Sequence, residues 1–175
     1  MEKGLQLRDA RAGDRDAIRT VTLAAFREYA AVMPAHWERY RQGILNALAE
    51  AGSAEQIVAE RDGAIAGAVL LYPAGTVFSR PDGARVTIER PEVRLLAVAP
   101  AERGRGIGAA LLSECIGRAR RGGAADLTLH TSDFMRAGQR MYERMGFVRA
   151  PELDFHPSPG LTVMGYRLRL GDPAS

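Results

Sequence analysis

Apolar and polar residues are distributed along the chain with two different periods. The segment 93–100 is an almost continuous apolar run, which predicts a buried strand. Residues 107–121 carry apolar side chains at helical spacing, which predicts an amphipathic helix. In the segment 161–170, Tyr166, Leu168 and Leu170 alternate with arginines, which predicts a strand with one buried face. Strands and helices therefore alternate, and a mixed α+β protein is expected.

The N-terminal part predicts one strand and two helices. Residues 5–8 are expected to form a short first strand, and Asp14 is placed to cap a helix that follows it. Its apolar face consists of residues spaced by three or four positions: Ile18, Val21, Ala25 and Tyr29. Pro34 is expected at the first position of a second helix, because proline lacks the backbone N–H that is unpaired there anyway. One side of this helix carries Trp37, Tyr40, Ile44 and Leu48.

The middle of the chain predicts a hairpin. Two apolar runs, 56–60 and 64–71, are separated by Arg61, Asp62 and Gly63, and Asp-Gly is a strong turn signal. Residues 73–90, rich in proline, glycine and arginine, and 151–160, rich in proline, are expected to be loops, apart from the start of the next strand. The whole order predicts an α+β fold in one domain, residues 1–175, with helices on the faces of a mixed sheet.

Composition narrows the class of protein. The hydrophobic fraction of 46% and the charged fraction of 26% are those of a globular domain. A formal net charge of +3 suits an anionic ligand but is too small to predict nucleic-acid binding. No segment is long and apolar enough to predict a membrane span, and no membrane partner is expected. Cys115 is the one cysteine, so a reducing cytoplasm is the expected location, and a homodimer is left open.

The segment from Arg103 to Gly108 is the most informative motif. It reads Arg-Gly-Arg-Gly-Ile-Gly and lies between the strand at 93–100 and the helix at 107–121. In this layout the unpaired N–H groups of the first helical turn and the positive end of the helix dipole face an anion. Glycines let the backbone approach such a ligand closely, and Arg103 and Arg105 add positive charge. A phosphate-bearing ligand is therefore predicted.

Three kinds of phosphate loop have to be distinguished. A mononucleotide loop would end in Gly-Lys-Ser/Thr, which is absent here. The dinucleotide pattern G-x-G-x-x-G/A fits Gly104, Gly106 and Ala109, but the acidic residue that should end the next strand, Asp126, precedes it instead. The third pattern, Arg/Gln-x-x-Gly-x-Gly/Ala, fits Arg103, Gly106 and Gly108.

A second motif decides between these three loop patterns. Residues 142–147 read Tyr-Glu-Arg-Met-Gly-Phe at the end of a predicted helix, which Asp133 is placed to cap and Gly146 to end. Together with the glycine loop, in this order and spacing, the segment resembles the GNAT superfamily of N-acetyltransferases. The resemblance is specific between Glu92 and Phe147. It implies a mixed, mostly antiparallel sheet in which two strands splay apart, and the pantetheine arm of acetyl-CoA lies in the gap.

The resemblance also implies roles for residues of this chain. Backbone groups of Leu96, Ala97 and Val98 would bind the pantetheine arm and polarise the thioester carbonyl. The pyrophosphate would lie on the loop and first helical turn, namely Arg103, Gly104, Arg105, Gly106, Ile107, Gly108 and Ala109. No metal is implied, and acetyl-CoA would be a cosubstrate. The expected activity is acetyl transfer to a primary amine, on a small molecule or on a protein, by direct attack in a ternary complex.

Two side chains are candidates for the chemistry. The conjugate acid of an alkyl amine has a pKa of about 10.4, so at pH 7 only roughly one amine molecule in 2,500 is neutral. A group that accepts the proton of the ammonium is therefore useful. Glu92, at the start of the strand before the loop, is the expected base, with an ion pair to Arg94 or Arg90 as the structural alternative. Glu89 is the substitute if the strand is bulged. Tyr142 is expected near the thioester sulfur, as a donor to the departing thiolate.

The remaining candidates have simpler interpretations. Cys115 and the methionines at 135, 141 and 145 are expected in the core, although many relatives carry a cofactor-binding asparagine where this chain has Met135. His36, His130 and His156 lack metal-ligand spacing, and His130 alone is an auxiliary base candidate. The acceptor is expected to be selected by the two N-terminal helices and the loops 73–90 and 151–160. These segments contain a mixture of side chains that selects no class of amine: Trp37, Tyr40, Phe78, Arg80, Asp82, Asp154, Phe155 and His156. A non-catalytic acyl-CoA sensor and an NAD(P)-binding oxidoreductase are the alternatives.

Overall fold

The computed structural model describes residues 4–79 and 83–171 of the 175-residue chain. The chain forms two compact units, the first Met1–Leu71 with Leu95–Glu114 and the second Tyr72–Arg94 with Cys115–Ser175. The single domain over 1–175 stays a prediction.

The secondary structure is α+β, as the sequence predicts. In the described ranges the helices are α1 (Arg15–Phe26), α2 (Trp37–Ala49), α3 (Ile107–Arg121) and α4 (Arg136–Arg144). The strands are β1 (Gln6–Asp9), β2 (Glu55–Arg61), β3 (Ala64–Tyr72), β4 (Val77–Ser79), β5 (Arg85–Thr87), β6 (Glu92–Val98), β7 (Asp126–Ser132), β8 (Val148–Arg149), β9 (Phe155–Ser158) and β10 (Leu161–Arg169). Short 3₁₀ turns are η1 (Ala12–Asp14), η2 (Arg27–Ala30), η3 (Pro100–Glu102) and η4 (Pro151–Leu153).

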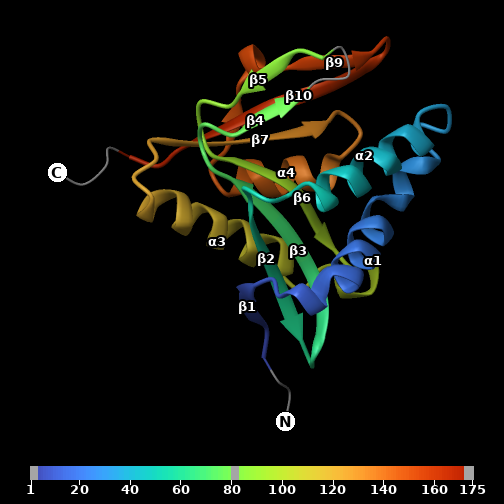
Figure 1. The fold of residues 1–175 in the computed structure, drawn as a ribbon, viewed down its shortest axis with the longest axis vertical. Coiled ribbons are helices and arrows are strands. Elements are labelled where there is room, and N and C mark those ends of the chain that lie inside the picture. The colour runs from blue at the N-terminus through green and yellow to red at the C-terminus, as the bar shows by residue number, and fades with distance from the viewer. Residues whose placement is uncertain (1–3, 80–82, 172–175) are drawn as a thin grey trace. The chain divides into compact units, whose positions relative to one another are not determined.

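The strands form a mixed sheet (Figure 1). Among the described residues it has eight strands, in the order β1-β2-β3-β6-β7-β10-β8, with β9 paired to β10. The pairs β1–β2, β2–β3, β7–β10, β8–β10 and β9–β10 are antiparallel, whereas β6 pairs with β7 in parallel. A mixed, mostly antiparallel sheet was expected, and it is confirmed.

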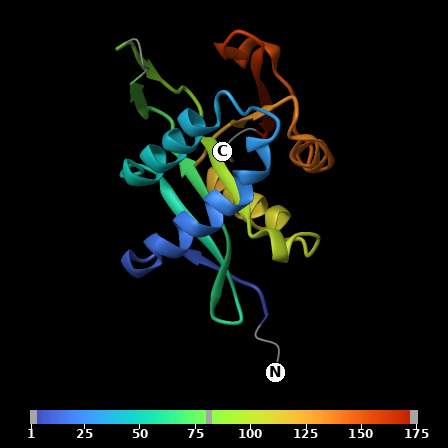
Figure 2. The same cartoon turned by 90° about the vertical axis from the view of Figure 1, so that its right-hand side faces the viewer.

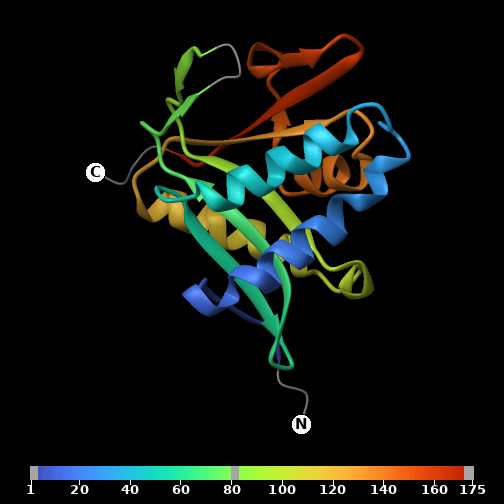
Figure 3. The same cartoon turned by 45° about the vertical axis from the view of Figure 1, so that its right-hand side comes forward.

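The first unit has helices on both faces of its strands. Ile18 of α1 packs against Val58 of β2 and Ala68 of β3, and Leu48 of α2 joins this cluster. Figure 3 shows α1 and α2 in front of these two strands. Successive strand residues point to opposite faces, so Gly67 lies on the other face. A Cβ there would stand 2.9 Å from the carbonyl oxygen of Ala97 and within 3.1 Å of side-chain atoms of α3. Glycine at this position therefore permits the close approach of β6 and α3 to β3.

The hairpin between β2 and β3 has the turn that Asp-Gly predicts. Asp62 and Gly63 have φ angles of 51° and 81°, the left-handed conformation required at both central positions of the favoured two-residue turn. The turn is at the lower end of the ribbon in Figure 2. The predicted hairpin is therefore confirmed.

The second unit is built on the long β7–β10 pair. This ladder runs from Asp126 opposite Arg169 to Ser132 opposite Val163. The parallel β6–β7 register in this unit places Glu92 beside Thr128 and Val93 beside Leu129. The pairing of β6 with β7 therefore brings the buried carboxylate of Glu92 next to the strand that carries His130.

Several predicted boundaries are wrong. The second helix begins at Trp37 and not at Pro34, because residues 34–36 form a turn. Asp133 caps no helix: α4 begins at Arg136 with Met135 at the capping position. Asp14 does precede α1, but its carboxylate accepts from the backbone N–H of Arg11 and does not cap the helix.

Two expected loops contain strands. Residues 73–90 include the β4–β5 hairpin, drawn in green in Figure 2, and residues 151–160 include η4 and β9. The short β8 was not predicted either. Arg85–Thr87 is exposed throughout, so the hairpin has no alternating apolar pattern that could have revealed it.

Candidate active site

The glycine loop has two glycines in the left-handed conformation. Gly104 and Gly106 have φ angles of 76° and 75°, and a Cβ on either would meet no protein atom within 4 Å among the described residues. Ile107, the first residue of α3, is 2% exposed and anchors the helix start in the core. One side of the loop backbone is therefore open, and the helix that follows the loop is fixed in the core by Ile107. These residues fit a phosphate ligand.

Arg103 has a role that the sequence did not reveal. Its guanidinium donates to Glu28 at 2.7 Å and to the carbonyl oxygen of Ala25 at 2.9 Å, both near the end of α1. A cation at a helix C-terminus is favourable, because the last carbonyls and the dipole are negative there. Arg103 thus ties the loop to α1, whereas a direct contact with phosphate was expected of it.

The strand before the loop carries a backbone outlier. Leu95 has a φ angle of 51°, which costs a non-glycine residue about 1–3 kcal/mol and persists where the surrounding structure imposes it. Next along β6, Ala97 is buried while Leu96 and Val98 are half-buried. The expected role of these three residues in binding pantetheine stays a prediction.

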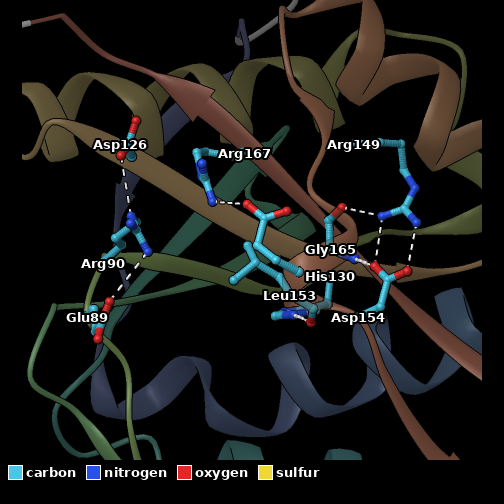
Figure 4. Close-up of polar contacts among 10 residues, drawn as sticks. Glu89, Arg90, Asp126, His130, Arg149, Leu153, Asp154, Gly165 and Arg167 are labelled. Atoms are coloured by element: carbon cyan, nitrogen blue, oxygen red, sulfur yellow. Dashed lines mark hydrogen bonds and ion pairs between the residues drawn. The ribbon is translucent and has the colours of Figure 1, made fainter.

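Glu92 is the centre of a charged cluster in the second unit. Its side chain is 5% exposed, and its Oε1 accepts from Arg94 Nε at 2.8 Å and lies 3.2 Å from His130 Nδ1. His130 Nε2 lies 2.9 Å from the carbonyl oxygen of Leu153 (Figure 4). The ion pair with Arg94 is the structural alternative that the sequence left open, and the pairing with His130 is new.

Burial and charge oppose each other in this cluster. Burial, the largest effect, raises the pKa of Glu92, but hydrogen bonds and charges from His130 and Arg94 bring it below its usual value. Burial likewise lowers the pKa of His130 most strongly, but the hydrogen bond and charge of Glu92, with the Leu153 carbonyl, raise it above 6.5. Each partner therefore stabilises the charged form of the other.

Arg94 is held in place by aromatic rings. Its guanidinium carbon lies 3.7 Å from the centre of the Phe78 ring and 5.5 Å from that of Tyr72. Phe78 belongs to the unpredicted β4 strand. This stacking orients Arg94 toward Glu92 and gives the β4–β5 hairpin a place beside the cluster.

Glu89 is placed differently from Glu92. Its side chain is 84% exposed and pairs at 3.7 Å with Arg90, which also reaches Asp126 at 3.3 Å (Figure 4). Glu89 therefore lies in a surface ion-pair network, and Glu92 is the better candidate for a base.

Tyr142 is half-buried on α4. Its ring packs against Phe147 and Tyr166, with centroid separations of 6.1 and 6.3 Å. The hydroxyl folds back along the helix, so that a Cβ on Gly138 would lie 3.6 Å from it. Glycine at position 138, one turn earlier, thus places no side chain against the ring and hydroxyl of Tyr142. The role of the hydroxyl as a donor to a thiolate stays a prediction.

The other sequence candidates fall into simpler places. Cys115 is fully buried, as expected, whereas the methionines at 135, 141 and 145 are only half-buried. Arg80 and Asp82 lie outside the described residues. Across residues 4–79 and 83–171, no three His, Cys, Asp or Glu side chains are arranged to hold a metal ion. In the same ranges, no helix has the length and apolar character needed to cross a membrane.

Comparison with known families identifies the class. Residues 22–147 match the model of the acetyltransferase (GNAT) family. The chain therefore belongs to the GNAT family and is an acyltransferase by class, as the two sequence motifs predicted. The mixed, mostly antiparallel sheet and this membership together exclude the NAD(P)-binding alternative.

Individual relatives support the assignment. The chain is 35% identical over 112 residues to mycothiol acetyltransferase of Nocardia farcinica, a match that covers 64% of this chain and 31% of that protein's length. The chain thus spans about a third of this curated relative. A crystal structure assigned to the GNAT family from Desulfovibrio desulfuricans has a TM-score of 0.69 at 22% identity, covering 96% of this chain and all of that one. A GNAT acetyltransferase of Brucella melitensis, solved with acetyl-CoA, has a TM-score of 0.61 at 25% identity, covering 98% and 92%.

Proposed function

We propose that this chain transfers the acetyl group of acetyl-CoA to a primary amine, by direct attack in a ternary complex. The observation that carries the proposal is the glycine loop at the start of α3. Its two left-handed glycines are open to the outside, in a chain of the GNAT family. Acetyl-CoA supplies an activated thioester, and the loop supplies backbone N–H groups for its pyrophosphate.

The loop residues Arg103 to Ala109 would hold the pyrophosphate mainly through their backbone. Gly104 and Gly106 fit this role, because any side chain there would occupy the open space above the loop. Backbone groups of Leu96, Ala97 and Val98 would bind the pantetheine amides and polarise the thioester carbonyl.

Glu92 and Tyr142 would carry the proton transfers. The amine arrives largely as an ammonium, and Glu92 would take its proton directly or through water. The Tyr142 hydroxyl would stabilise the departing thiolate by a hydrogen bond. The presence of both side chains favours an enzyme over a non-catalytic acyl-CoA sensor, which would need the loop alone.

The acceptor is proposed only as a primary amine. In the second unit, Phe78, which stacks on Arg94, and Phe155 and Asp154, which interact with His130, would help to select it. Trp37 and Tyr40 on α2 are further candidates from the first unit. A reducing cytoplasm is the proposed location, because it suits a chain with one cysteine.

A screen of amines tests the proposal. Acetyl-CoA and a panel of polyamines, amino acids, amino sugars and peptides would be incubated with the protein, and both thiol release and acetylated product measured. Thiol release matched by acetylated amine supports the proposal. Tight binding of acetyl-CoA without transfer to any amine would identify a sensor, and no binding would contradict the assignment of the loop.

A further inference from the structure

The contacts of His130 fix where its protons are. The carbonyl oxygen of Leu153 is only an acceptor, so His130 Nε2 must carry a hydrogen and donate it at 2.9 Å. The other ring nitrogen, Nδ1, faces Oε1 of Glu92 at 3.2 Å. A carboxylate is also only an acceptor, so this second contact is a hydrogen bond only when one proton lies between Nδ1 and the carboxylate.

Glu92 and His130 therefore share one titrating proton. With the proton present, the pair is an imidazolium beside a carboxylate, or a neutral imidazole beside a carboxylic acid. Without this proton, a neutral imidazole faces a buried carboxylate that keeps only its contact with Arg94. Interacting sites of this kind titrate with pKa values that belong to the pair and not to either residue.

We propose that Glu92 and His130 act as one base in the proposed acetyl transfer, with Glu92 receiving the proton of the amine and His130 storing it. The step balances: the ammonium gives one proton to the Glu92 carboxylate, and a proton passes to Nδ1 of neutral His130. The products are a neutral amine and an imidazolium paired with the carboxylate. No further reactant is needed. The inference rests on the proposed function.

The charge arrangement supports this division of roles. Within the pair the pKa of Glu92 is lowered and that of His130 is raised, so the proton that the amine gives up is held on the histidine and not on the carboxylate. Both contacts of the carboxylate involve Oε1, which leaves Oε2 as the oxygen to meet an amine or a water molecule. The Leu153 carbonyl holds the Nε2–H tautomer, so that Nδ1 is the site that receives the proton.

The neighbouring charges leave this pair as the titrating unit. Arg94 contacts Glu92 and disfavours the imidazolium, but it stays charged throughout the relevant range. Asp154 also interacts electrostatically with His130, and hydrogen bonds from Arg149 lower its pKa to about 2, so it is ionised throughout. The Phe155 ring, 5.3 Å from the imidazole between centroids, shields it on one side.

NMR titration of the histidine rings tests the sharing of the proton without any activity measurement. The chain has three histidines, so His130 can be assigned by its loss in His130→Gln. We expect the pKa of His130 to lie above its usual value, and Glu92→Gln to lower it, because the hydrogen bond and the charge that oppose burial most strongly are then removed. An unchanged His130 pKa in Glu92→Gln would overturn the pair.

The pH profile of kcat/KM tests the catalytic role. We expect its acidic break to coincide with the His130 pKa from NMR. His130→Gln, whose amide can still reach the Leu153 carbonyl, should move this break to lower pH and reduce kcat/KM at pH 7 by about 10- to 100-fold. His36→Gln, on the N-terminal side of α2, is the matched control and should leave the break in place.

The outcomes separate the pair from the proposed function. An active protein in which His130→Gln changes only the height of the profile, and not its break, contradicts the storage of the proton on His130. A wild-type protein that binds acetyl-CoA but acetylates no amine contradicts the proposed function, and with it the catalytic role, whatever the NMR titration gives. A circular-dichroism melt of each variant excludes unfolding as the cause of a lost activity.

Discussion

Replacing Gly106 with valine should abolish cofactor binding while the protein remains folded. Gly106 has a φ angle of 75°, and a Cβ there would meet no described protein atom within 4 Å. The substitution therefore costs the free protein only backbone strain, about 1–2 kcal/mol for a left-handed residue with a Cβ and somewhat more for a β-branched one. For a chain of this size that corresponds to a melting temperature lower by roughly 2–8 °C.

The effect on the ligand is larger. The new side chain occupies the space in which the phosphate would meet the loop. If two charge-assisted hydrogen bonds are lost, at about 1.5–3 kcal/mol each, the Kd rises by about 10²- to 10⁴-fold. Coenzyme A at 100 times the wild-type Kd should stabilise the wild type by about 2.7 kcal/mol, or roughly 5–11 °C. The variant should gain about 1 °C or less.

Gly63 provides a matched control. It has a φ angle of 81°, lies at the tip of the β2–β3 hairpin, and also has open space around it. Gly63→Val should lower the melting temperature of the free protein to a similar degree, yet keep the full shift with coenzyme A. The assay is thermal unfolding with and without ligand. The reasoning is refuted if Gly106→Val keeps the wild-type shift, or if Gly63→Val loses it equally.

Four other substitutions test individual residues. Tyr142→Phe should lower kcat about 10- to 100-fold with little change in cofactor binding; an unchanged kcat, where chemistry limits the rate, would make Tyr142 a packing residue. Glu92→Gln should cost most near neutral pH and less as pH approaches the pKa of the amine, since more amine is then already neutral; an equal loss of kcat/KM at every pH would indicate positioning of a cation instead. Arg103→Ala should weaken coenzyme A binding about 3- to 10-fold, because the loop loses its tie to α1. Glu28→Gln should also weaken the binding of coenzyme A, measured by calorimetry. Stronger binding would instead show that Glu28 keeps Arg103 away from the phosphate.

The sequence predicts best where a regular pattern coincides with glycine. The helix at 107–121 has the predicted bounds, because its apolar period begins directly after the glycine loop. Gly146, with a φ angle of 93°, follows α4 as expected. The start of α4 was missed because β7 continues to Ser132 and a turn follows, so that Asp133 never reaches the capping position.

The geometry of the site depends on contacts that no local pattern contains. Glu92 and His130 are 38 positions apart, and only the parallel pairing of β6 with β7 brings them together. Arg103 and Glu28 are 75 positions apart. The left-handed conformation of Leu95 likewise has no sequence signal, because leucine rarely adopts it and tertiary structure must impose it. The motifs thus identify the family and the loop, whereas the partners of Glu92 require the fold.

The initial rate of acetyl transfer, measured while acetyl-CoA and the best amine are both varied, tests the central claim most directly. Direct attack in a ternary complex predicts intersecting double-reciprocal lines, with one acetylated amine formed for each thiol released. Parallel lines would indicate a covalent acetyl-enzyme. Parallel lines, or thiol release without acetylated amine, would contradict the account.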